Sequence, residues 1–119
     1  MNISLNSLNV SKCRDIMLYE SCVTAHYIKL LEEYKKLYLP EPEKNWGFDE
    51  YNRRVYELSC VDQVEMLIRL NPEMDPQDIL CEFAAELEPA YNDFDTPDEV
   101  FEILGAFIDT LEALSGWLD

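Results

Sequence analysis

The chain has 119 residues, of which 25 are acidic and nine are basic, so its formal net charge is −16. Hydrophobic residues make up 48% of the sequence and aromatic residues 12%, a content that excludes a disordered acidic tail and predicts a packed core. The negative charge also argues against direct binding of DNA or RNA, because the phosphate groups would repel it.

The sequence contains no uninterrupted apolar run of the length, about eighteen residues, that a membrane span needs. Residues 1–12 lack the basic start and the continuous apolar stretch of a signal peptide. We therefore expect a cytoplasmic protein that binds no membrane. Its four cysteines, Cys13, Cys22, Cys60 and Cys81, form no C-x-x-C pair, and we expect reduced thiols, most of them buried, rather than disulfides.

The first predicted element is a long amphipathic helix over residues 12–38, with Ser11 as its N-cap. Apolar side chains recur there every three or four residues and form one stripe: Ile16, Tyr19, Val23, Tyr27, Leu30, Tyr34 and Leu37. Residues 39–47 follow with two prolines and a glycine, which predicts a loop.

A helical pattern resumes near Asp49 and continues to residue 70. Within it, Ser59 followed by Asp62 resembles a capping signal. Residues 49–70 are therefore predicted either as two short helices or as one bent helix.

The last two predicted helices have clear N-terminal signals. Asp75 is placed as an N-cap, with Pro76 at the first helical position and Asp78 in the first turn. In the second of these helices, Thr96 and Glu99 have the spacing of a capping box.

Two residues predict where these helices stop. Pro89 should end or kink the helix that starts after Asp75, because proline lacks the backbone N–H of a helix interior. Gly116 stands where a helix commonly ends. The expected breaks are thus 39–47, 71–75 and 89–96.

These patterns predict an all-α fold, a compact bundle of four to five amphipathic helices. A faint alternation of Ile3, Leu5 and Val10 leaves a short extended segment at the N-terminus as an option. We expect one acidic helical domain over residues 1–119, with a leader at 1–11 and a helical body at 12–119.

Negative charge is concentrated in the second half of the chain. Arg69 is the last basic residue, and residues 70–119 contain fourteen carboxylates and no lysine or arginine. Favourable interaction with helix N-termini accounts for five of them: Asp75, Asp78, Asp95, Asp98 and Glu99. It does not explain the other nine, nor the missing bases.

Helical geometry places many of these carboxylates in two stripes, since successive residues are rotated by about 100°. One stripe contains Asp75, Asp78, Glu82 and Glu86, and the other contains Asp98, Glu102, Asp109 and Glu112. With Asp93 and Asp95 between them, these ten residues are the predicted partner-binding surface. Stacked like charges cost a few tenths of a kcal/mol per pair, and an ordinary solvated face relieves that repulsion with lysine.

Other site chemistries are poorly supported by the sequence. Cys22 and His26 are one turn apart but lack further ligands for a metal or a third group for nucleophilic catalysis, so His26 is expected to be a partly buried core residue. The segment from Asp93 resembles a calcium loop only in its first positions, because it has Asp98 where glycine is needed. Isolated glycines form no phosphate loop, and we expect no enzyme, metal or cofactor.

Aromatic residues at helix ends and loops are candidate interface anchors, although packing is the default interpretation for each. These residues are Tyr38, Trp46, Phe48, Tyr91 and Trp117.

The favoured functional hypothesis is an acidic inhibitor that binds a basic nucleic-acid-binding protein. Its carboxylates, about 6 Å apart on successive helical turns, would occupy the positions of phosphate groups on that protein. Phage anti-restriction and anti-CRISPR proteins and nuclease immunity proteins share this size and charge, a likeness of composition only. The alternative is a small adaptor or chaperone that binds a protein through apolar surface, with the charge serving solubility. A homodimer is left open.

Overall fold

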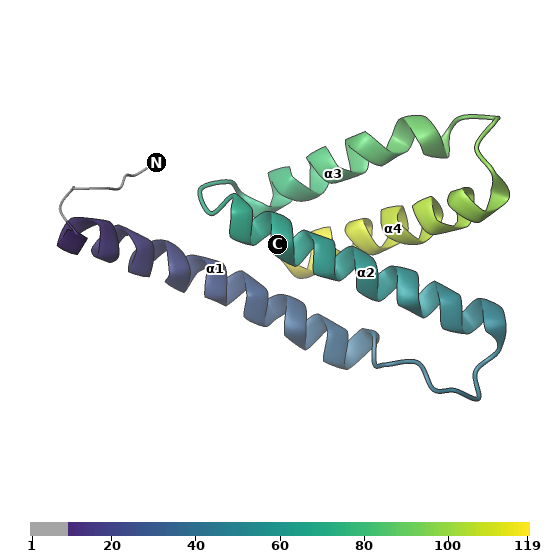
Figure 1. The fold of residues 1–119 in the computed structure, drawn as a ribbon, viewed down its shortest axis with the longest axis horizontal. Coiled ribbons are helices and arrows are strands. Elements are labelled where there is room, and N and C mark those ends of the chain that lie inside the picture. Colours follow the sequence, from purple (N-terminus) through teal and green to yellow (C-terminus); the bar gives the residue numbers. More distant parts are fainter. Residues whose placement is uncertain (1–9) are drawn as a thin grey trace.

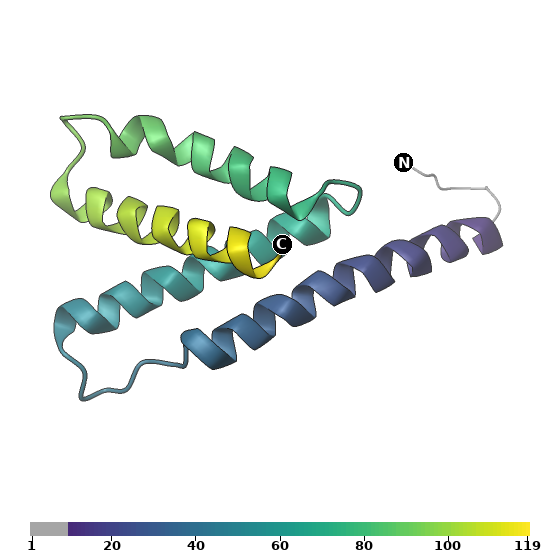
Figure 2. The ribbon, with the colours of Figure 1, turned by 180° about the vertical axis from the view of Figure 1, so that it is seen from behind.

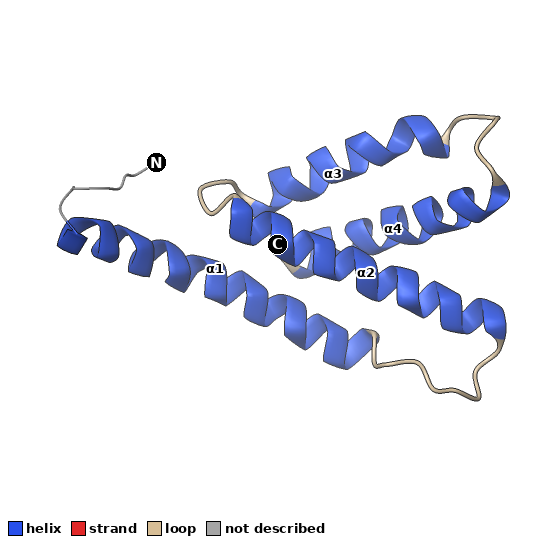
Figure 3. Cartoon of the chain, in the orientation of Figure 1, coloured by secondary structure: helices blue, strands red, loops and turns tan. Residues whose placement is uncertain are grey.

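The computed structural model describes residues 10–119, with side chains from Val23 onward, and these residues form four helices and no strand (Figures 1 and 3). The helices are α1 (Val10–Tyr38), α2 (Phe48–Leu70), α3 (Pro76–Tyr91) and α4 (Asp98–Trp117). The all-α bundle is confirmed, with four helices. Of the suggested extended segment, Val10 is helical, and Ile3 and Leu5 lie outside the described residues.

Residues 48–70 form one continuous helix, so the capping signal at Ser59 was a wrong indication of a break. The side chains of Ser59 and Asp62 are exposed, and Asp62 forms an ion pair with Lys35 of α1 at 3.3 Å. The opposite face of α2 is buried without interruption through this region, and packing of that face keeps the helix continuous.

The start of α3 is as predicted. Asp75 is the N-cap, its Oδ1 accepts the backbone N–H of Gln77 at 2.8 Å, and Pro76 occupies the first turn. Pro89 does not end α3, because it lies inside the helix, which continues to Tyr91. The other alternative, a kink at Pro89, stays a prediction. A proline in the last turn removes only one backbone hydrogen bond, which the chain tolerates there.

Three other end signals were also wrong. The Thr96 hydroxyl donates to the carbonyl of Ala90 in α3, and Pro97 is the N-cap of α4, so no capping box forms. Gly116 is helical, because α4 ends one residue later at Trp117. Ser11 lies inside α1, which begins at Val10, two residues before the expected helical body.

Helix α2 is central to the bundle, since it contacts each of the other three helices, and α3 and α4 pack against each other as an antiparallel pair. The loops 39–47 and 92–97 lie at one end of the molecule, so the N-termini of α2 and α4 are at the same end (Figures 1 and 2). The first half of α1 extends beyond the other helices in both views. None of the helices in the described part of the chain has the length and apolar character required to cross a bilayer.

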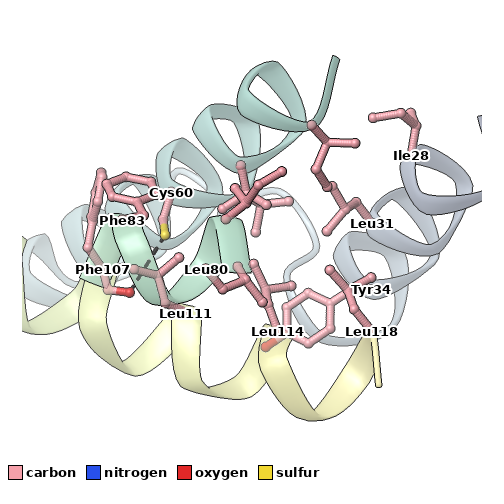
Figure 4. Packing of buried hydrophobic residues seen from close by; sticks show 14 of the residues in the cluster. Ile28, Leu31, Tyr34, Cys60, Leu80, Phe83, Phe107, Leu111, Leu114 and Leu118 are labelled. Carbon is pink, nitrogen blue, oxygen red and sulfur yellow. Dashed lines mark hydrogen bonds between the residues drawn. The ribbon is translucent and has the colours of Figure 1, made fainter. Parts of the chain in front are cut away.

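One hydrophobic core runs through the four helices (Figure 4). The largest fully buried side chains are Leu31, Cys60, Val61, Val64 and Leu114. The indole N–H of Trp117 donates to the Leu30 carbonyl at 2.8 Å and so connects the end of α4 to α1.

Candidate protein-binding surface

All fourteen carboxylates after Leu70 are on exposed residues. None of them is drawn into the core, where the buried positions of α3 and α4 are apolar apart from Thr110. The Thr110 hydroxyl is satisfied within α4 by donating to the Ala106 carbonyl at 2.8 Å. The carboxylates of residues 70–119 are therefore accessible to solvent or to a partner.

The α3 stripe has no ion-paired member among the described side chains. Asp78, Glu82 and Glu86 are exposed on a flank of α3 that adjoins the buried Ile79 and Phe83. They form no ion pair with a described lysine or arginine. Asp75, the fourth member, serves as the N-cap, so its role is structural at least in part.

The α4 stripe is arranged differently, because Arg53 of α2 reaches it. The Arg53 guanidinium donates to Asp109 Oδ2 at 2.9 Å and lies 3.8 Å from Glu57 of its own helix. Among described side chains, Asp109 is the only carboxylate after Leu70 with a basic partner. Asp98, Glu102 and Glu112 are exposed and form no ion pair with any side chain that the structure describes.

The loop between α3 and α4 carries the remaining predicted carboxylates and an aromatic side chain that the sequence reasoning missed. Asp93 Oδ1 accepts the backbone N–H of Asp95 at 2.9 Å, and Thr96 ties the loop to α3. Between the two aspartates, Phe94 is 99% exposed. Internal hydrogen bonds thus hold the loop in a conformation that presents a phenyl ring to solvent.

A groove with a volume of about 660 Å³ lies between α2 and α4, near the end that carries this loop. Four carboxylates, one guanidinium and several aromatic rings line it. The charged lining residues are Asp49, Arg53, Glu99, Glu102 and Asp109, and the aromatic ones are Phe48, Tyr56, Tyr91 and Phe101. Two members of the predicted α4 stripe, Glu102 and Asp109, therefore belong to a groove rather than to a flat ridge.

The five aromatic anchor candidates have different surroundings. Phe48 is 80% exposed and Tyr38 is exposed, whereas Trp46, Tyr91 and Trp117 are half-buried. Trp46 packs under the Arg54 guanidinium, whose carbon lies 5.1 Å from the ring centroid. Tyr91 stacks on Phe101, with ring centroids 4.7 Å apart and an interplanar angle of 5°.

The expectation of a core histidine was wrong: His26 is exposed and contacts the edge of the neighbouring Tyr27 ring. The side chains of Cys13 and Cys22 lie outside the described residues, so their burial is not tested. Of the two described thiols, both free, Cys60 is buried and Cys81 is exposed. No group of three or more potential metal ligands occurs among the described side chains.

Burial raises the pKa of the Cys60 thiol to about 12, and its Sγ donates to the Phe107 carbonyl at 3.6 Å (Figure 4). This environment favours the neutral thiol over the thiolate, which is the nucleophilic form. Cys60 therefore acts as a core residue that joins α2 to α4.

Comparison of the chain with protein-family models, with curated proteins and with solved structures found no match. The surface of the molecule is therefore the basis for inferring its function. Sequence reasoning located its carboxylates but missed Arg53, Phe94 and Phe101. Phe94, flanked by two aspartates in a predicted loop, is the one that a search for apolar residues outside helical stripes could have found.

Proposed function

We propose that this chain is a non-enzymatic inhibitor that docks its acidic helical surface on a basic nucleic-acid-binding protein and so competes with the nucleic acid. The observation that carries the proposal is the exposure of all fourteen carboxylates after Leu70, with Asp109 alone paired to a described basic side chain. Carboxylates left without internal counter-charges are available to the cations of a partner.

The distribution of charge supports a directional interaction. The paired basic residues Lys35, Arg53, Arg54 and Arg69 all lie on α1 and α2. Helices α3 and α4 contribute acid only, so the molecule is electrostatically polarised. Such a field accelerates association with an oppositely charged surface and orients the encounter.

Competition would follow from shared chemistry. A protein that grips DNA or RNA presents lysine and arginine to phosphates, and carboxylates accept the same charge-assisted hydrogen bonds. A surface that occupies those side chains excludes the nucleic acid. The phage anti-restriction proteins, anti-CRISPR proteins and nuclease immunity proteins that share this composition are the functional class we propose.

The test is capture from cell lysate on the immobilised chain, with elution by rising salt and by duplex DNA. The control bait carries Asp78→Asn, Glu82→Gln, Glu86→Gln, Glu102→Gln and Glu112→Gln, which spares the paired Asp109. We expect nucleic-acid-binding proteins to be enriched on the parent over the control and to be released by DNA. Equal capture on both baits, or retention in the presence of DNA, would argue against the proposal.

A second candidate function, an adaptor or chaperone that binds through apolar surface, is favoured by the exposure of Phe94 and Phe48. It predicts capture that persists at high salt, because hydrophobic contacts are not screened by ions. It also predicts that Phe94→Ser abolishes capture, whereas neutralised carboxylates leave it intact.

A further inference from the structure

The groove between α2 and α4 combines two features that together specify a ligand. Its lining has four carboxylates against a single guanidinium, an excess of negative charge. It also has aromatic rings that are accessible to solvent: Phe48 is 80% exposed and Phe101 is 43% exposed. A cation alone would not need the rings, and an apolar ligand would avoid the carboxylates.

The structure itself seats a guanidinium at this groove. Arg53 donates to Asp109 across the α2–α4 gap at 2.9 Å, although its side chain is 45% exposed. Three other lining carboxylates, Asp49, Glu99 and Glu102, have no ion pair with a described side chain. The groove therefore accommodates one guanidinium and retains acceptors for another.

The aromatic geometry favours arginine over lysine. The Tyr91 and Phe101 rings are parallel and stacked, and the exposed part of Phe101 leaves ring surface for a planar group. A guanidinium stacks on a ring and bonds a carboxylate through two N–H groups at once, whereas an ammonium presents a point charge. At the mouth of the groove, Phe48 would contact apolar side chains next to that arginine.

We propose that the groove between α2 and α4 binds an arginine-bearing amphipathic segment of the basic partner, with the guanidinium on Phe101 and Glu102 and apolar side chains on Phe48. This inference rests on the proposed function and assigns the specific contact to the groove. The carboxylates of α3 then supply long-range attraction without discrimination between arginine and lysine.

The test uses the full chain labelled with ¹⁵N and two amphipathic helical peptides, one with leucine and arginine and one with lysine at every arginine position. The groove variant is Phe48→Ser, Glu99→Gln, Glu102→Gln. The matched control, Leu70→Ser, Glu82→Gln, Glu86→Gln, also removes one exposed apolar side chain and two carboxylates, but away from the groove. Helical circular dichroism verifies that both variants fold.

We expect the arginine peptide to bind the parent about tenfold more tightly than the lysine peptide and to shift the amide signals of Tyr56, Tyr91 and Gly105. The groove variant should lose that preference and about tenfold in affinity, while the control retains the preference. Equal affinity for both peptides, or equal losses in both variants, would overturn the inference.

The proposed function can fail separately. If lysate capture shows no enrichment of nucleic-acid-binding proteins while the groove variant alone loses the arginine preference, the groove is a site for arginine-bearing segments of another partner class. If capture depends on charge as proposed while both variants bind the peptides alike, the acidic inhibitor stands and the groove assignment is wrong.

Discussion

Cys60 is the buried thiol that connects α2 to α4, and its titration should lower the free energy of unfolding as the pH becomes alkaline. The thiol of an unfolded chain ionises near pH 8.5, whereas burial raises the pKa of Cys60 in the folded chain to about 12. Below about pH 8.5 both states keep the proton and the full stability is present. As pH rises from there toward 12, the unfolded state is favoured by up to about 1.4 kcal/mol per pH unit.

The measurement is urea denaturation between pH 7 and 11 for the parent and for Cys60→Ala. The variant starts less stable, since it loses the sulfur packing, but its alkaline slope should be shallower. Tyr34, whose pKa is raised by burial and by Glu57, contributes a remaining slope of the same sign. Identical slopes in the two proteins would contradict the prediction.

Trp117 is the residue whose hydrogen bond joins the end of α4 to α1. Its ring packs edge-on against Tyr34 and Tyr38, and its indole N–H donates to the Leu30 carbonyl. Trp117→Phe keeps a ring there but removes the donor, so we expect a loss of about 1 kcal/mol in the free energy of unfolding. Hydrogen exchange of the α1 amides at 28–36 should accelerate.

Trp46→Phe is the control for that change. Trp46 lies in the loop between α1 and α2, where its ring packs on Arg54 of α2, and it does not bridge α1 and α4. It should leave α1 exchange near the parent rate. If both tryptophan variants speed exchange in α1 to the same degree, the Trp117 hydrogen bond is not the connection we describe.

At the scale of the helices, α3 depends on its N-cap. Asp75→Ala removes the acceptor for the Gln77 N–H, and N-cap losses of this kind reduce stability by about 0.5–2 kcal/mol. Asp75→Asn keeps an oxygen acceptor and should retain most of that stability. Thermal and urea unfolding of the three proteins tests this, and an alanine variant as stable as the asparagine variant would show that the cap contributes nothing.

The helix signals differ in how far apart the interacting groups lie, and this decides which of them could be read from sequence. Asp75 and its donor are two residues apart, so the cap was predictable. Thr96 instead bonds Ala90, a carbonyl at the end of the preceding helix, which depends on how the loop folds back. Ser59 had the local spacing of a cap, yet the buried face of α2 kept that helix continuous.

The same distinction applies to the surface of the whole molecule. Exposure of the carboxylates was predictable from helical periodicity, because a rotation of about 100° per residue gathers most of them into one stripe on each of α3 and α4. The pairing of Arg53 with Asp109 joins residues 56 positions apart and depends on how α2 lies against α4. The exposed carboxylates could therefore be predicted from the sequence, but the groove between α2 and α4 could not.

For the whole molecule, repulsion among the unpaired carboxylates of α3 and α4 should lower the stability of the fold, although the same negative charge supports binding. The variant Asp78→Asn, Glu82→Gln, Glu86→Gln, Glu102→Gln, Glu112→Gln removes five exposed carboxylates that have no described basic partner, and changes the net charge from −16 to −11. Relief of like-charge repulsion should hold or raise the melting temperature in low salt. Asp78, in the first turn of α3, offsets part of that gain.

Salt separates this effect from a change in packing, because ions screen repulsion between exposed charges. The difference in melting temperature between parent and variant should shrink as salt rises from low to about 1 M. Toward a captured basic partner, the same variant should associate more slowly with little change in dissociation, since exposed charges act chiefly on the encounter. A variant that is less stable than the parent at low salt would show that the carboxylates of α3 and α4 do not destabilise the fold. A variant that associates at the parent's rate would show that they do not steer the partner.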